Sequence, residues 1–370
     1  MNFVTIVGNR PQFIKMAAVQ RELERRGLTD ANTIIHTGQH YDENMSADFF
    51  GELDIPLPSA NLCVGSGPHG QMTGRMLEKI ENILRRLSPD FVMVYGDTNS
   101  TLAGALAAAK LNIPVVHVEA GLRSGNMQMA EEVNRSVVDH ISDILFSPCN
   151  MATFNLMEEG MGLVDSIHQV GDVMYDAFLY YSQIACQSTI LDDLNLKPKE
   201  YYLATVHRTE NIDDSDRFNS IMEQLGAVAD GMDVIVPLHP RLKERLTDAS
   251  FYCYKGTYPI APVGYIDMLQ LERNAQIIIT DSGGVQKEAY WSHVPCITLR
   301  DETEWVETVK CGANILVDVM KSKGIQDALV DNIEKIIDLH RDPWKDDYYG
   351  DGTASSQILD TLIRRFDIAD

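Results

Sequence analysis

The sequence predicts an α/β protein built from two doubly wound parallel sheets. Short apolar, β-branched runs alternate with helical patterns along the chain, which is the rhythm of strand–helix–strand units. The alternation restarts after Gly171-Asp172. The length of 370 residues also exceeds what one ordinary hydrophobic core accommodates. We therefore expect two units joined near residue 170.

The expected elements follow this alternation in order. In the first half the strands are Phe3–Val7, Thr33–His36, Phe91–Val94, Val115–Val118 and Ile144–Ser147, and the helices between them are Gln12–Arg26, Met72–Leu87, Thr101–Leu111 and Glu131–Ile141. In the second half the strands are Tyr201–Thr205, Asp233–Pro237, Ala275–Thr280 and Cys296–Leu299, and the helices are Ser215–Ala229, Met268–Arg273, Val285–Ser292 and Gly324–His340.

Composition excludes several classes of function. A net charge of −23 argues against nucleic acid or an anionic membrane surface as a partner. No apolar run approaches the roughly 18 residues of a membrane span, and the first residues resemble a strand rather than a signal peptide. The six cysteines lack CxxC spacing, so we expect free thiols and a cytoplasmic protein.

Cofactor motifs are also missing. Apart from HTGQH, the histidines show no HxxxH spacing, and no mixed Cys/His spacing occurs, so we expect no metal site. The first strand is not followed by GxGxxG, and no Walker lysine motif occurs. Nicotinamide and ATP are therefore not expected as cofactors.

The most informative stretch is an apolar run that ends abruptly at Asp281-Ser282-Gly283-Gly284 and leads into a helix. Ser282 suits the helix N-cap, and glycines let a ligand approach the backbone N–H groups. Such helix N-termini bind anions, phosphates above all. Glu288 lies one turn further on, in reach of a sugar hydroxyl. An ordinary capped helix would give the same pattern.

Three carboxylates stand near strand ends in the first half. Asp97 follows a strand, Glu119 ends another, and Glu131 opens a helix. We expect them to converge on one rim, where crowded like charges favour proton exchange near neutral pH. Each also has a simpler explanation: an N-cap or turn residue for Asp97, and an ion pair with Arg123 for Glu119. Acidic residues that open a helix, here Glu131 and above all Glu132, are ordinary complements to the helix dipole.

Basic residues follow other strands. Arg10 and Lys15 lie at the start of the first helix, where they form either a phosphate clamp or a solvated helix start. His207 is a candidate proton carrier or phosphate donor, and loop hydrogen bonding is its alternative. His239, Arg241 and Arg300 follow the later strands.

Ten motifs, in this order, resemble the non-hydrolysing UDP-N-acetylglucosamine 2-epimerase family. Each is weak singly, but together they span residues 8 to 305. They are GNRPQFIK, HTGQH, YGDTNST, HVEAGLRS, EEVNR, VGDVMYD, TVHRTEN, PLHPR, DSGGVQKEA and LRDETEW.

The resemblance implies a GT-B-like architecture, in which two Rossmann-like domains close on a UDP-sugar in the interdomain cleft. The N-terminal domain would comprise residues 1–170 plus 354–370, because the C-terminal helix Ala354–Phe366 is expected to cross back onto it. Residues 171–353 would form the UDP-binding domain. The family also implies a homodimer.

The resemblance further implies the chemistry. UDP leaves C1 as the C2 proton is removed, which gives a 2-acetamidoglucal, and UDP re-adds after protonation on the opposite face, without NAD or metal. The product would serve the synthesis of cell-surface polysaccharide or glycan precursors. The residues implied are Asp97, Glu119, Glu131 and His207 in catalysis, and Arg10, Lys15, Arg123, Arg135, His239, Arg241, Ser282, Gly283, Gly284, Glu288 and Arg300 in binding UDP or the sugar.

Some positions depart from the family pattern. Ala130 stands where Pro usually precedes the Glu-Glu pair. Many members of the family bind a regulatory UDP-N-acetylglucosamine at a site that Gln39 and Arg75 would mark here. In those members a basic residue follows the Gln-His pair, whereas here Gln39-His40 is followed by Tyr41-Asp42-Glu43, which weakens the expectation of allosteric activation.

The sugar and the reaction class stay open at this point. RPQFIK, HGQMTGRML and RDETEW look closer to the branch acting on UDP-2,3-diacetamido-2,3-dideoxy-glucuronate, whose carboxylate would meet Arg123, Arg135 or Lys287. A GT-B glycosyltransferase is the alternative of another class. A hydrolysing epimerase and a non-catalytic nucleotide-sugar sensor are further ones.

Overall fold

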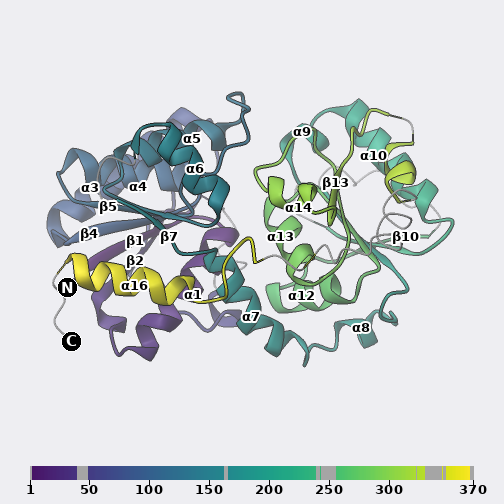
Figure 1. The fold of residues 1–370 in the computed structure, drawn as a ribbon, viewed down its shortest axis with the longest axis horizontal. Helices are drawn as coiled ribbons and strands as arrows, with labels where there is room; N and C mark the ends of the chain where they lie inside the picture. Colours follow the sequence, from purple (N-terminus) through teal and green to yellow (C-terminus); the bar gives the residue numbers. More distant parts are fainter. Residues whose placement is uncertain are drawn as a thin grey trace. The chain divides into compact units, whose positions relative to one another are not determined.

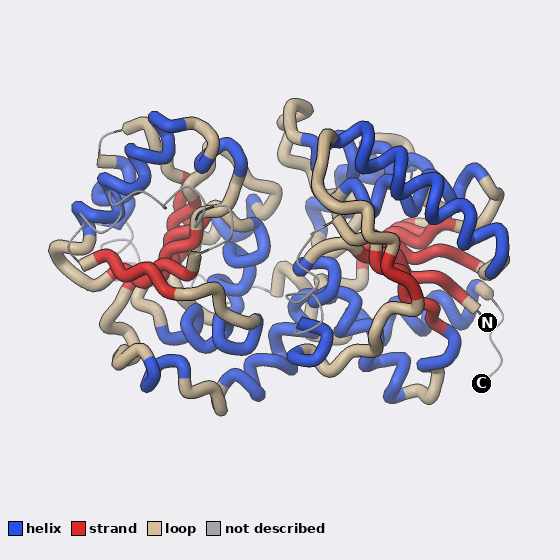
Figure 2. Tube along the Cα trace, turned by 180° about the vertical axis from the view of Figure 1, so that it is seen from behind, coloured by secondary structure: helices blue, strands red, loops and turns tan. Residues whose placement is uncertain are grey.

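The computed structural model divides the chain into two compact units, Met1–Leu179 with Tyr348–Asp370, and Tyr180–Asp347 (Figure 1). The structure describes residues 2–39, 49–161, 166–238, 242, 256–321, 323–329, 344 and 347–366. Each unit contains a parallel sheet with helices around it, as Figure 2 shows. The predicted fold class, two doubly wound α/β units, is confirmed.

The sheet of the first unit has the strand order β3-β2-β1-β4-β5-β6-β7 among the described residues. Every pairing is parallel, so each connection is a crossover. The strands are β1 Phe3–Val7, β2 Asn32–His36, β3 Ala60–Asn61, β4 Phe91–Tyr95, β5 Val115–Val118, β6 Ile144–Ser147 and β7 Ile167–Gln169. The helices are α1 Arg10–Arg25, α3 His69–Leu87, α4 Asn99–Lys110, α5 Ala130–Ile141, α6 Asn150–Glu158 and α16 Ala354–Arg365, with a 3-10 turn at Thr29–Ala31. Helix α7 Val173–Ala185 begins in this unit and ends in the second one.

Strand alternation sends neighbouring side chains of this sheet to opposite faces. Val4 of β1 belongs to the apolar cluster formed with α3, α4 and α5. Phe3 points the other way and stacks on Phe91 at 4.8 Å, which in turn stacks on Phe366 at 4.6 Å. The C-terminal helix α16 therefore covers that second face, beside α1 (Figure 1).

The sheet of the second unit has the order β10-β9-β8-β11-β12-β13, again all parallel. Alternation again divides its side chains, because Ile279 joins the cluster with α10, whereas Ile278 joins the cluster with α12 and α13. Its strands are β8 Tyr202–Thr205, β9 Val234–Pro237, β10 Thr257–Ile260, β11 Ile277–Thr280, β12 Cys296–Thr298 and β13 Asn314–Leu316. Its helices are α8 Ile190–Asp193, α9 Thr209–Ile212, α10 Ser215–Val228, α12 Tyr265–Asn274, α13 Gly283–Trp291 and α14 Val306–Lys310.

The sequence patterns missed the strands at the sheet edges and the helices α6, α7, α8, α9 and α14. Strands β3, β7, β10 and β13 are short and lie at or beside the sheet edges, where polar residues obscure the apolar run. The expected helix over residues 324–340 is helical from 324 to 329, and the rest of it lies outside the described residues. Across the described ranges, no helix has the length and apolarity that crossing a membrane requires.

Candidate active site

Both sheets reverse their strand order once, and the loops at these switch points are where open α/β sheets bind ligands. In the first sheet the reversal lies between β1 and β4, so the loops that carry Arg10 and Asp97 are neighbours. In the second sheet it lies between β8 and β11, so the loops of His207 and Ser282 are neighbours. Topology alone thus assembles one group of candidate residues in each unit.

Gln12 joins the two loops at the first switch point, and sequence reasoning missed it. Its Oε1 accepts from the Gly8 N–H at 2.7 Å, and its Nε2 donates to the carbonyl of Tyr95 at 2.8 Å and to Thr101 Oγ1 at 2.9 Å. Asn9 caps α1 beside it by accepting from the Gln12 N–H. A glutamine after Pro11 gives no sign by itself of being buried, so only the neighbouring loop reveals this role.

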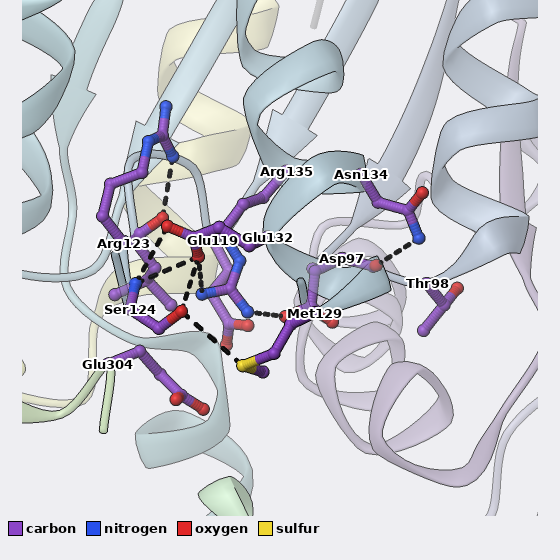
Figure 3. Close-up of polar contacts among 12 residues, drawn as sticks. Asp97, Thr98, Glu119, Arg123, Ser124, Met129, Glu132, Asn134, Arg135 and Glu304 are labelled. Atoms are coloured by element: carbon purple, nitrogen blue, oxygen red, sulfur yellow. Dashed lines mark hydrogen bonds and ion pairs between the residues drawn. The ribbon is translucent and has the colours of Figure 1, made fainter. Parts of the chain in front are cut away.

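Asp97 forms an ion pair with Arg135 of α5, a side chain that is almost fully buried (Figure 3). The same guanidinium lies 3.2 Å from Glu132. On the backbone side, Asn134 Nδ2 donates to the carbonyl of Asp97 at 2.9 Å. Thr98 then caps α4, so Asp97 stands directly before a helix N-terminus. Helix α5 therefore holds both the carboxylate and the peptide of Asp97.

Glu119 is brought beside Asp97 by an unusual backbone. Its φ of +71° is left-handed, a conformation that costs a non-glycine residue on the order of 1 kcal/mol or more. The buried carboxylate lies 2.5 Å from Lys15 Nζ. A methyl group placed on Gly96 would come within 3.5 Å of Glu119 Oε1, which locates this carboxylate next to the residue that precedes Asp97. Lys15 thus neutralises Glu119 in this structure.

The two adjacent glutamates of α5 have different environments. Glu131 is exposed on the first turn of the helix. Glu132, which the sequence treated as a simple complement to the helix dipole, is buried and accepts from the N–H groups of Ser124 and Gly125 at about 3 Å (Figure 3). Glu132 therefore organises the 124–125 loop, whereas Glu131 stays accessible.

Arg123 has two carboxylate partners. It lies 2.7 Å from Asp139 and 2.7 Å from Glu159. The ion pair considered for Glu119 from the sequence was with Arg123, but the structure gives Glu119 the Lys15 partner instead. Arg123 links α5 and α6 in this arrangement.

The second switch point contains a buried aspartate that holds a histidine. His207 Nδ1 lies 2.9 Å from Asp281, which is fully buried, whereas about a third of the His207 side chain is exposed. Asp281 also accepts from the N–H groups of His207 and Arg208 and from Asn211. Burial alone would raise the pKa of this carboxyl, but the neighbouring His207 and these donors lower it to about 2. From the sequence, Asp281 is recognisable only as the residue at which the apolar run ends.

Ser282 caps α13 by accepting from the Val285 N–H at 3.4 Å. Gly283 follows, and a Cβ there would lie 2.6 Å from Glu304 Oε1 and 3.2 Å from Trp305 Nε1, so any side chain would displace Glu304. Arg300 is 2% exposed and donates to Glu304 at 2.9 Å, while its Nη1 has no partner among the described residues. A partly exposed N-terminal turn and a guanidinium nitrogen without a described partner together suit an anionic ligand.

Glu288, one turn along α13, is buried beside Tyr265 of α12. Burial and the neighbouring carboxylates of Glu288 and Glu272 raise the pKa of Tyr265 well above its usual value. The phenol therefore stays protonated at neutral pH. Lys287, beside it, lies 3.9 Å over the ring of Trp305.

The remaining candidates are dispersed. Arg10 lies 4.9 Å over the ring of Phe49. Gln39 accepts from Ser100 at 2.7 Å, and Arg75 is exposed on α3. His239, Arg241 and the Tyr41-Asp42-Glu43 segment lie outside the described residues. Where side chains are described, no three His, Cys, Asp or Glu residues gather in a way that would hold a metal ion.

A sequence profile described as UDP-N-acetylglucosamine 2-epimerase matches residues 21–363, nearly the whole chain. The chain belongs to the UDP-N-acetylglucosamine 2-epimerase family. Its members are isomerases, so the resemblance carried by the ten sequence motifs is confirmed.

Two relatives show the range of this epimerase family. A UDP-N-acetylglucosamine 2-epimerase homolog from Methanococcus maripaludis is 48% identical, over 98% of this chain and 99% of its own. The UDP-2,3-diacetamido-2,3-dideoxy-D-glucuronate 2-epimerase of Pseudomonas aeruginosa is 45% identical, over 98% of this chain and 100% of its own.

A solved epimerase structure shares the fold. The Methanocaldococcus jannaschii UDP-GlcNAc 2-epimerase in complex with UDP-GlcNAc and UDP matches with a TM-score of 0.89 at 42% identity, covering 98% of this chain and 100% of that one. The predicted GT-B-like architecture, with two Rossmann-like domains, is confirmed by this likeness.

Proposed function

We propose that this protein is a non-hydrolysing UDP-sugar 2-epimerase that interconverts UDP-N-acetylglucosamine and UDP-N-acetylmannosamine. The observation that carries the proposal is the pair of carboxylates at the first switch point, Asp97 and Glu119, each matched with its own buried cation. Family membership supports this reaction over that of a glycosyltransferase, the alternative from another class.

The carboxylates supply the proton chemistry. The C2 proton of the sugar is weakly acidic because no carbonyl is adjacent, so its removal must accompany departure of UDP from C1. Asp97 and Glu119 follow two different strands, and the exposed Glu131 lies on the first turn of α5, which suits acid–base groups that serve opposite faces of the ring. Arg135 and Lys15 place one positive charge beside each of the two carboxylates, Asp97 and Glu119.

The second unit holds the leaving group. The N–H groups at the start of α13, together with Ser282, Gly283 and Gly284, suit the diphosphate, and the partly unpaired Arg300 adds a positive charge nearby. His207, oriented by Asp281, presents its other ring nitrogen to the leaving oxygen. Glu288 suits the ribose hydroxyls. Arg10, His239 and Arg241 complete the diphosphate side in this proposal.

The reaction balances without an oxidant. One C–H and one C–O bond break to give UDP, a proton and the 2-acetamidoglucal. The same two kinds of bond then re-form, with the proton on the opposite face. We therefore propose that neither NAD nor a metal takes part in the bond-making steps.

Proton exchange at C2 tests the proposal. The enzyme is incubated with UDP-N-acetylglucosamine in deuterium oxide, and the C2 proton is followed by NMR. Deuterium at C2 within intact UDP-sugar, including the manno epimer, is the expected result. Asp97→Asn should abolish exchange while sparing UDP binding. Free sugar, or no exchange with this substrate or its diacetamido-uronate analogue, contradicts the proposal.

A second candidate substrate is UDP-2,3-diacetamido-2,3-dideoxy-glucuronate, which the 45% identity to the Pseudomonas aeruginosa enzyme favours. A substrate carboxylate would need a cation, and Arg135 or Lys287 would supply it. Comparing kcat/KM for the two UDP-sugars decides between them.

We also propose, from family membership, a cytoplasmic homodimer in which Gln39 and Arg75 mark a regulatory site. Light scattering of the purified protein measures its mass directly. Activity measured against UDP-N-acetylglucosamine concentration in Gln39→Ala tests the regulatory role.

A further inference from the structure

His117 is a fully buried histidine of β5 that the proposed chemistry leaves without a role. Its Nδ1 lies 2.7 Å from Asp139 Oδ1 of α5. Its Nε2 lies 2.7 Å from the backbone carbonyl of Gly96, which immediately precedes Asp97. The ring therefore bridges a buried carboxylate and the turn that carries a proposed catalytic residue.

Both partners of His117 are hydrogen-bond acceptors. A carbonyl oxygen cannot donate. Asp139 accepts on its second oxygen from Arg123 at 2.7 Å and from the Gly121 N–H at 3.1 Å. Burial alone would raise the pKa of Asp139, but His117 and Arg123 hold it below its usual value, so the carboxyl is ionised. Both ring nitrogens of His117 must then donate.

The Gly96 peptide is the point at which this bond acts on Asp97. Gly96 has a left-handed φ of +64°, and its N–H donates to the Val118 carbonyl. His117 fixes the peptide on the N-terminal side of Asp97, and Asn134 fixes the peptide on its C-terminal side. With both flanking peptides held, the Asp97 side chain leaves the backbone in one direction, toward Arg135.

We propose that His117 is a positioning residue, held doubly protonated between Asp139 and Gly96, which sets the orientation of the Asp97 carboxylate. The inference rests on the proposed function, in which Asp97 acts on the sugar. His117 touches no substrate in this scheme. Asp139 of α5 is held in place by Arg123, and His117 connects this fixed carboxylate to Gly96. The loop after β4 that carries Asp97 is thereby held in place as well.

The charged groups around His117 are consistent with a protonated ring. On the α5 and α6 side they are Asp139, Arg123 and Glu159. On the loop side they are the Lys15–Glu119 and Arg135–Asp97 pairs. Arg123 is matched by Glu159 as well as by Asp139, so the Asp139 carboxylate is not neutralised by Arg123 alone.

A matched pair of variants separates the two hydrogen bonds. The amide nitrogen of glutamine reaches the place of Nε2, and that of asparagine reaches the place of Nδ1. His117→Gln therefore keeps the bond to Gly96, whereas His117→Asn keeps the bond to Asp139. We expect kcat for C2 proton exchange to fall less than about 10-fold in His117→Gln and about 100-fold in His117→Asn, because small misplacements of catalytic groups cost about that much. KM should change less than about threefold in both.

Stability distinguishes this role from a purely structural one. His117→Gln leaves the buried Asp139 with one partner fewer, so its unfolding midpoint should be no higher than that of His117→Asn. A structural role would make kcat follow stability, with His117→Gln as the weaker enzyme. Equal kcat values in the two variants, or that reverse order, would overturn the proposal.

The protonation of the ring is measured in the wild-type protein. Histidine labelled with nitrogen-15 and assigned through backbone-correlated NMR spectra should show an N–H signal from each ring nitrogen of His117 at pH 8. An unprotonated ring nitrogen overturns the inference, even if neither variant folds. The NMR result does not depend on enzymatic turnover. If the wild-type protein shows both N–H signals but does not exchange the C2 proton of the sugar, the proposed function fails and the protonation of His117 does not.

Discussion

Replacing Asp281 by asparagine removes the buried charge that orients His207. The carboxylate accepts from the His207 and Arg208 N–H groups, from Asn211 and from the His207 ring. Asparagine keeps one acceptor oxygen and turns an N–H₂ group toward partners that are donors themselves. Leaving buried hydrogen-bond donors without their acceptor costs about 1–3 kcal/mol, so we expect the free energy of unfolding to decrease by about that amount.

The pH dependence of stability gives a second estimate of how much the Asp281 carboxylate contributes to the free energy of unfolding. An unfolded aspartate ionises near pH 3.8, whereas the pKa of Asp281 is lowered to about 2. Because the folded pKa is the lower one, ionised Asp281 stabilises the protein by about 2–3 kcal/mol above about pH 4. This stabilisation is lost as pH falls through about 2. Asp281→Asn should unfold at lower denaturant concentration at pH 7, and the difference from wild type should shrink toward pH 2.

The catalytic consequence is measured on the same variant. With its Nδ1 partner altered, His207 loses its preferred tautomer, and general acid assistance is worth about 100-fold or more, so kcat for C2 exchange should fall by at least that factor. Asp213→Asn, an exposed aspartate at the end of α9, is the matched control and should match wild type. An Asp281→Asn enzyme with wild-type kcat and wild-type stability at pH 7 would refute this reasoning.

Three further predictions concern neighbouring residues. Gly283→Ala would place Cβ 2.6 Å from Glu304, so UDP affinity measured by calorimetry should fall at least 10-fold, and Gly231→Ala, with no neighbour inside 3.7 Å, should not change it. Gln12→Leu leaves buried groups unpaired and should lower the free energy of unfolding by about 2–4 kcal/mol; less than about 0.5 kcal/mol contradicts this role. Lys15→Met leaves the buried Glu119 carboxylate without its cation, so the free energy of unfolding measured with denaturant should decrease by about 3–5 kcal/mol. Lys197→Met, which removes an exposed lysine, should not change it.

Much of the fold was predictable because its signals are local. Buried parallel strands such as Phe3–Val7 and Val115–Val118 read as apolar runs, and their predicted bounds match the structure. Helix starts were predicted less well. Helix α13 begins at Gly283 rather than Val285, since the cap and not the apolar pattern determines where a helix begins. The short edge strands carry too few residues for any periodicity.

In the candidate site, too, the features that depend on local sequence were predictable and the long-range contacts were not. Sequence order placed Asp97, Glu119, His207 and Ser282 after strands, and switch-point topology then makes them neighbours in their respective sheets. Their partners were not predictable. Lys15 pairs with Glu119 across 104 positions, and His207 meets Asp281 across 74. Separations of this length leave no periodic trace in a single sequence.

The sequence by itself determined the fold class, the strand-end positions of the candidate residues and the epimerase family, because strand periodicity, turn residues and motif order are properties of contiguous chain. Only the tertiary structure decided which charges are matched. It showed that Glu119 is neutralised by Lys15, that Asp281 orients His207, and that His117 links Asp139 to the loop of Asp97. The physical reason is that burial removes water from a charge, so its state depends on partners that folding brings from elsewhere in the chain.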